Sequence, residues 1–108
     1  MSVTLEAVEE VCLGPVERIP PGEGRRFTVR GREIAVFRAR GGALSAIDNR
    51  CPHRDGPLSE GVAGGGYVIC PYHAYRFDLS TGACLNDAAC SVAAYSVREE
   101  SGQVVLKL

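Results

Sequence analysis

The chain has little of several features that common functions require. It contains no apolar run close to the ~20 residues of a membrane-spanning helix. Its first residues, MSVTLE, include neither a basic start nor an apolar stretch, so no secretory signal is visible and a cytoplasmic location is expected. Its 12 Lys and Arg nearly balance 13 Asp and Glu. Without a basic excess, the chain is not expected to bind nucleic acid.

Histidine is scarce as well, with only two residues, and cofactor motifs of common enzymes are missing. No Gly-x-Gly-x-x-Gly unit for NAD or flavin is visible. We find no tandem repeat, low-complexity tract, linker or long helix. The 108 residues are 45% hydrophobic and 23% charged, as is typical of one globular domain spanning 1–108.

Cysteine, in contrast, is abundant. Five residues in 108 would suggest disulfides in a secreted protein. An odd number in a chain with no visible signal indicates metal binding or reactive thiols instead.

Both ends of the chain show β patterns. Strands are expected at residues 25–29, 33–38, 44–47, 92–97 and 104–108, with turns at 30–31, 41–42 and 100–102. Residues 33–38 are apolar on both faces, which favours a central strand. Residues 2–12 are ambiguous, because Leu5, Val8 and Cys12 have helical spacing, but the segment is short and we favour a strand near Val11.

The middle of the chain has a different composition. Residues 48–91 hold three of the six Pro, six of the 13 Gly and four of the five Cys. This composition predicts a loop-rich, metal-bound lobe inserted between β-rich flanks. Residues 64–66, all Gly, predict a tight turn between two short extended pieces.

Two short loops in this lobe repeat one pattern. Cys51-Pro52-His53 is followed, after 16 residues, by Cys70-Pro71-Tyr72-His73. A zinc finger usually pairs Cys with Cys and His with His. Here each loop offers one thiolate and one imidazole, which a two-iron cluster can use when one iron takes both thiolates and the other both imidazoles. A zinc site, and a set of packed core Cys and His, remain alternatives, although the second leaves the repeated Cys-Pro pattern unexplained.

The segments CPHRDGPLSEG and CPYHAYRFDLSTG resemble the two cluster-binding loops of Rieske-type proteins. AIDNRCPH and REIAVFR also resemble soluble Rieske ferredoxins, and the resemblance runs from about residue 10 to the end. It implies an all-β Rieske fold of stacked antiparallel sheets, with an inserted cluster-binding lobe at about 46–84 on a β base. It also implies one [2Fe–2S] cluster, with Cys51 and Cys70 on a buried iron and His53 and His73 on an outer iron.

The sequence departs from parts of the family pattern. Gly56 and Tyr72 stand where high-potential members carry a disulfide, and Tyr75 and Phe77 stand where those members have Ser and Tyr hydroxyls near the cluster. Fewer donors to the cluster sulfurs imply a reduction potential at the low end of the Rieske range, about −150 mV. Ala74 occupies a position that is commonly Gly, so a positive φ there would be strained.

The resemblance implies a one-electron carrier that passes electrons from a flavin-dependent reductase to a terminal oxygenase. Such a chain is expected to be a monomer when free and to catalyse no reaction by itself. The alternative is the small Rieske subunit of an NAD(P)H-dependent nitrite reductase, acting with the large subunit, because residues 84–87, Cys-Leu-Asn-Asp, resemble that group. A zinc-bound interaction module is a third reading.

The other three cysteines have no assigned ligand role. We expect Cys12, Cys84 and Cys90 to be small buried hydrophobic residues. A second metal site is disfavoured, because they form no close Cys-x-x-Cys pair and no His is left. Tyr72 and Tyr75 adjoin the second loop and are candidates for a docking face.

Overall fold

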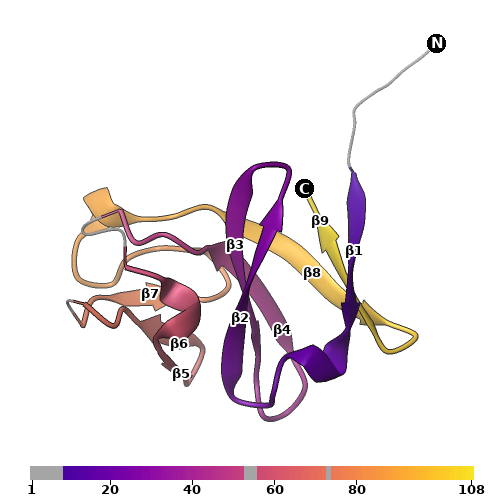
Figure 1. Cartoon of the computed structure of the whole chain (residues 1–108). Coiled ribbons are helices and arrows are strands. Elements are labelled where there is room, and N and C mark those ends of the chain that lie inside the picture. The colour runs from indigo at the N-terminus through magenta and orange to yellow at the C-terminus, as the bar shows by residue number, and fades with distance from the viewer. Residues whose placement is uncertain (1–8, 53–55, 73) are drawn as a thin grey trace.

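A computed structural model describes residues 9–52, 56–72 and 74–108, and its regular structure is almost entirely β (Figure 1). The strands are β1 (Glu10–Pro15), β2 (Glu23–Val29), β3 (Arg32–Arg38), β4 (Leu44–Asp48), β5 (Val62–Gly64), β6 (Tyr67–Ile69), β7 (Arg76–Asp78), β8 (Ala94–Glu100) and β9 (Gln103–Lys107). Three single 3₁₀ turns are η1 (Val16–Arg18), η2 (Leu58–Glu60) and η3 (Ala88–Cys90). Within the described ranges, no helix is long and apolar enough to cross a membrane.

The strands form two antiparallel sheets. The larger has six strands in the order β1-β9-β8-β4-β3-β2, and the smaller has three in the order β5-β6-β7. In Figure 1 the small sheet lies on one side of β2–β4, and β1 and β9 lie on the other. The prediction of an all-β fold with stacked antiparallel sheets is confirmed.

Strand β3 links two hydrophobic cores, because successive side chains of a strand point to opposite faces. Ile34 and Val36 belong to a core that also contains residues of β9. Ala35 and Phe37 belong to a second core, formed with the small sheet. The apolar pattern on both faces of this segment therefore correctly predicted an interior strand: β3 pairs with β2 and β4 and is buried on both faces.

The second core contains most of the cysteines. Its buried members are Ala35, Phe37, Ile47, Cys51, Leu58, Val68, Cys70, Phe77, Leu79, Cys84 and Cys90. The large sheet thus holds the small sheet and the intervening loops through one apolar contact surface.

Several local predictions are confirmed, and two need correction. The turn at 64–66 joins β5 to β6, and the segment near Val11 is a strand. The strand expected from residue 92 begins only at Ala94, because the Val92 N–H donates to the Gly82 carbonyl and the Ala93 N–H donates to the Asp48 carboxylate. The expectation that Cys12 is buried was wrong. Val11 and Leu13 pack on the core, so Cys12 between them faces solvent.

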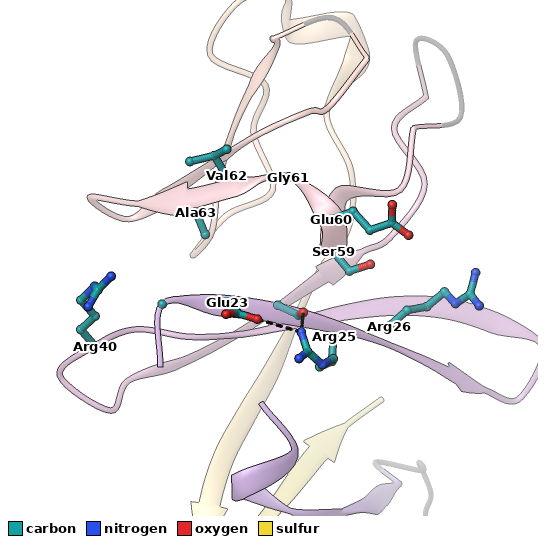
Figure 2. A pocket seen from close by; sticks show the side chains of 11 residues that line it. Glu23, Arg25, Arg26, Arg40, Ser59, Glu60, Gly61, Val62 and Ala63 are labelled. Carbon is teal, nitrogen blue, oxygen red and sulfur yellow. Dashed lines mark hydrogen bonds and ion pairs between the residues drawn. The ribbon is translucent and has the colours of Figure 1, made fainter. Parts of the chain in front are cut away.

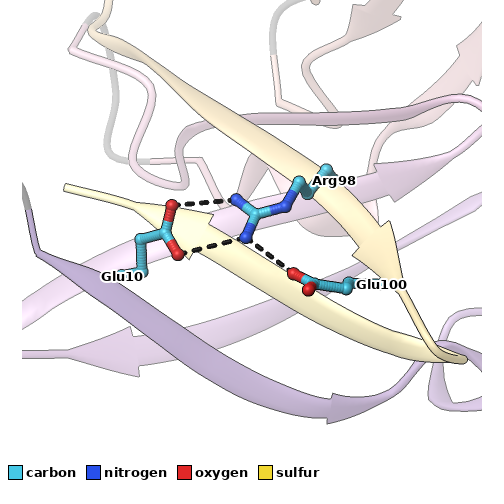
Figure 3. Close-up of polar contacts among 3 residues, drawn as sticks. All are labelled: Glu10, Arg98 and Glu100. Atoms are coloured by element: carbon cyan, nitrogen blue, oxygen red, sulfur yellow. Dashed lines mark hydrogen bonds and ion pairs between the residues drawn. The ribbon is translucent and has the colours of Figure 1, made fainter.

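A charged cluster joins β1 to β8 across the outer side of the large sheet (Figure 3). Both terminal nitrogens of Arg98 donate to Glu10, at 3.0 and 3.1 Å, and one also donates to Glu100 at 2.7 Å. The hydrogen bond from Arg98, and then its charge, lower the pKa of the Glu10 carboxyl below its ordinary value of 4.5.

We predict that Glu10→Gln lowers the stability of the fold only where Glu10 is ionised. A lowered folded-state pKa contributes stability that is present above the unfolded value and is lost as the pH falls through the folded value. Urea unfolding at pH 7 should show a small loss relative to wild type, which shrinks as the pH falls below the ordinary value of 4.5 and disappears once Glu10 is protonated in the folded chain. Glu99→Gln is the control, because no ion pair of Glu99 is found in the described part of the chain. An equal effect of Glu10→Gln at pH 7 and at a pH where Glu10 is protonated would contradict the assignment.

Candidate metal centre

Two buried cysteines begin the loops that the sequence pattern singled out. Cys51 follows β4 and is 0% exposed, and Cys70 follows β6 and is 1% exposed. The Cys51 N–H donates to the Gly56 carbonyl at 2.9 Å, and the Cys70 N–H donates to the Tyr75 carbonyl at 2.8 Å. Each cysteine therefore starts a short loop whose ends are hydrogen-bonded to each other.

Asn49 anchors the first of these loops and was not singled out from the sequence. Its side chain is buried, and its Oδ1 accepts the Ser59 N–H at 2.8 Å. Its N–H donates to the Glu33 carbonyl, and its carbonyl accepts the Leu58 N–H. Through these hydrogen bonds, Asn49 connects both ends of the first loop to β3. An Asn at the end of a strand, just before a Cys-Pro loop, is the available signal, since Asn side chains readily bond to nearby backbone.

The two loops pack directly against each other at Gly56. A Cβ atom at this position would lie 2.7 Å from the Cys70 Sγ and 3.3 Å from the Tyr72 ring. No side chain larger than hydrogen fits there without movement of one loop. Gly56 and Tyr72 stand where high-potential Rieske proteins carry a disulfide. Here the Tyr72 ring lies next to the backbone of Gly56.

Ala74 lies in the second loop, and its φ is +59°. Strain was expected here for a positive φ, because this position is commonly Gly in Rieske-type proteins. This left-handed conformation costs a residue with a Cβ roughly 1–2 kcal/mol. The Ala74 N–H donates to the Cys70 carbonyl at 3.0 Å, which helps to hold the turn in place. The strain lies next to the expected ligand His73.

The donor set fits a thiophilic metal centre. Two thiols from touching loops lie in one desolvated cluster, and sulfur ligands of this kind suit zinc and iron–sulfur clusters. The other two predicted ligands, His53 and His73, lie outside the described residues. Within the described ranges, no group of three or more His, Cys, Asp or Glu is placed to hold a metal ion. The structure therefore describes the thiol half of the predicted ligand set.

The remaining candidate residues divide between core and surface. Cys84 and Cys90 are buried, as predicted. Tyr72 is 62% exposed and lines a hollow of about 430 Å³ beside the loops, while Tyr75 is half-buried.

A larger hollow of about 640 Å³ lies between β2 and the η2–β5 segment (Figure 2). It is an open groove with a charged lining. Arg25 pairs with Glu23 at 3.1 Å in it, and Arg26 and Arg40 lie toward its two ends. Among the described residues, neither Cys51 nor Cys70 lines this groove, so it is separate from the thiol pair.

Comparisons with known proteins agree on one family. The family model described as Rieske [2Fe-2S] domain matches residues 9–96. The ferredoxin component of the naphthalene 1,2-dioxygenase/salicylate 5-hydroxylase systems of Ralstonia sp. is 33% identical over 107 residues, which cover 98% of this chain and 99% of the relative.

Two solved structures have the same fold over nearly their whole length. A putative NADH-dependent nitrite reductase small subunit from Mycobacterium tuberculosis superimposes with a TM-score of 0.88 at 26% identity, covering 95% of this chain and 97% of the other. The ferredoxin of carbazole 1,9a-dioxygenase from Nocardioides aromaticivorans IC177 gives 0.82 at 31% identity, covering 90% and 95%.

Some relatives are much longer than this chain. The 4beta-methylsterol monooxygenase of Methylococcus capsulatus is 44% identical over 61 residues, which are 56% of this chain but 16% of that protein. The chain therefore spans about a sixth of this relative.

We predict that Gly56→Ala markedly lowers the iron content of the purified protein, by at least about twofold, because the added methyl group displaces the Cys70 sulfur. Gly64→Ala is the matched control, since no atom lies within 4 Å of a Cβ at that position. Iron analysis and the visible spectrum measure the effect. Equal iron in both variants would contradict the close contact between the loops.

Proposed function

The chain belongs to the Rieske [2Fe-2S] domain family, and on this premise we propose that it carries single electrons from a flavin-dependent reductase to a terminal oxygenase. The whole-length match to a dioxygenase ferredoxin component is the observation that carries the proposal. A bound Rieske-type [2Fe–2S] cluster supplies the one-electron redox chemistry.

We further propose that Cys51 and Cys70 bind one iron, and His53 and His73 the other. The burial of both thiols in contacting loops supports this assignment. In this proposal, the cluster-binding lobe spans residues 46–84 approximately. The strands that precede and follow it in the sequence form its base. The apolar surface shared with β3 and β4 holds the lobe in place.

The proposed carrier works in the cytoplasm, is a monomer when free and meets its reductase and oxygenase in turn. All five cysteines lie in the described ranges and none of them forms a disulfide there, as is usual in a reducing compartment. Tyr72, exposed beside the second loop, belongs to the docking face in this proposal.

The second candidate is the small Rieske subunit of an NAD(P)H-dependent nitrite reductase. The TM-score of 0.88 to such a subunit, against 0.82 to the carbazole dioxygenase ferredoxin, favours it. The sequence identities, 26% against 31%, favour the ferredoxin. The two candidates share the cluster and differ in the partner.

The ligand assignment predicts how single substitutions change the spectrum. His53→Cys and His73→Cys should each alter or abolish the Rieske electron paramagnetic resonance signal of the reduced protein, because the ligand on one iron changes. Cys51→Ser and Cys70→Ser should reduce cluster content. Cys84→Ser, a substitution in the same core, is the control and should retain the signal. An unchanged signal in either His variant would disprove the assignment.

The partner is tested by purification and by reconstitution. A tagged chain from its native cells should elute as a free monomer and should support turnover when it is mixed with NADH, a flavin-dependent reductase and an oxygenase. Stoichiometric co-purification with a large reductase subunit, and electron transfer only within that complex, would contradict the carrier role and establish the second candidate.

A further inference from the structure

Two cysteines that the proposed function does not use lie at the two ends of one surface loop. Cys84 and Cys90 are 7% and 9% exposed, and both belong to the core beneath the small sheet. Residues 85–87 between them are exposed. Both cysteines therefore adjoin exposed residues and keep some exposure of their own, whereas Cys51 is 0% exposed.

The two ends of this loop are held against each other. The Val92 N–H donates to the Gly82 carbonyl at 2.9 Å, and the Cys84 N–H donates to the Ser91 hydroxyl at 3.2 Å. A Cβ at Gly82 would lie 2.1 Å from the Val92 carbonyl oxygen, so the segments are in close contact. Cys90 directly precedes Ser91, whose hydroxyl accepts the Cys84 N–H, so the loop returns the chain at Cys90 to the neighbourhood of Cys84.

The electrostatics of Cys90 agree with this placement. Desolvation raises the pKa of its thiol, and the nearby Asp87 carboxylate and the Cys84 sulfur raise the pKa further. The Cys90 Sγ also donates to the Asp87 Oδ2 at 3.7 Å. Because the thiolate is the nucleophile, the raised pKa of Cys90 means that mildly alkaline pH favours its reaction.

We propose that Cys84 and Cys90 form a redox-active dithiol that closes to an intrachain disulfide when the protein meets a small disulfide oxidant such as oxidised glutathione. One cysteine sulfur attacks the glutathione disulfide and releases one reduced glutathione. The second cysteine sulfur then attacks the mixed disulfide and releases another. The two cysteine protons pass to the two departing thiolates, so two thiols are oxidised and one disulfide is reduced.

The position of the loop gives such a bond a structural consequence. The Leu85 N–H donates to the Arg76 carbonyl at 2.8 Å, and the Asn86 side chain accepts the Arg76 N–H at 2.8 Å. Arg76 begins β7, directly after Tyr75, whose carbonyl holds the Cys70 N–H. A disulfide between Cys84 and Cys90 would therefore restrain β7. The residue before β7, Tyr75, is hydrogen-bonded to Cys70 in the second Cys-Pro loop. The proposal does not depend on which partner receives the electron.

Mass spectrometry tests the proposal on the wild-type holoprotein. The protein is incubated with oxidised glutathione at mildly alkaline pH, denatured, alkylated and digested with trypsin. Cys84 and Cys90 fall on one peptide, residues 77–98, whereas the other three cysteines fall on separate peptides. We expect this peptide to be two hydrogens lighter than its reduced form, without alkyl or glutathione groups. A peptide that ends with two alkyl groups, or with glutathione on either cysteine, would overturn the proposal.

Three controls keep the result specific. Cys12 is exposed and should carry glutathione in the same sample, which establishes that the reagent is active. Cys12→Ser should leave the two-hydrogen loss unchanged. Cys90→Ser should abolish the loss and leave Cys84 alkylated or glutathionylated. A two-hydrogen loss that persists in Cys90→Ser would contradict the pairing. Should Cys90→Ser not fold, the wild-type measurement still decides the question.

Discussion

The contact between the two Cys-Pro loops is the constraint on which the candidate centre depends. A bare backbone at Gly56 lets the first loop approach the Cys70 sulfur, so that thiols from distant parts of the sequence enter one desolvated cluster. Any side chain at this point would separate the loops, because protein interiors have no spare volume. Asn49 on one loop and the strained turn at Ala74 on the other fix the backbone on each side of this contact.

The position of the loops depends in turn on β3 and β4. Since β3 is apolar on both faces, it packs on the core of the large sheet and on the small sheet at once. Ile47 of β4 lies in the same core as Cys51, four residues later. The loops are therefore attached to the part of the sheet, β3 and β4, whose side chains are buried on both faces. Such an attachment suits the proposed electron carrier, because little reorganisation around the cluster should accompany a change of charge.

The sequence predicted those features that arise from local pattern. Alternating and continuous apolar segments identified the strands, the glycine run at 64–66 identified a turn, and the paired Cys-Pro loops identified the thiols. Features that arise from tertiary packing were missed. The burial of Asn49 depends on Ser59 and Glu33 in other segments, and the exposure of Cys12 depends on which face of β1 packs on the core. Ala74 was an intermediate case, since only its departure from the family pattern pointed to strain.

The account rests on the identity of the metal centre. One anaerobic sample of the purified chain should be divided for iron and zinc analysis and for electron paramagnetic resonance after dithionite reduction. The account predicts two irons per chain, as a [2Fe–2S] cluster requires, and a reduced signal of low average g, as two imidazole ligands on one iron produce. Stoichiometric zinc and a silent spectrum, in protein expressed with ample iron, would contradict the electron-carrier account and make the chain a structural metal module.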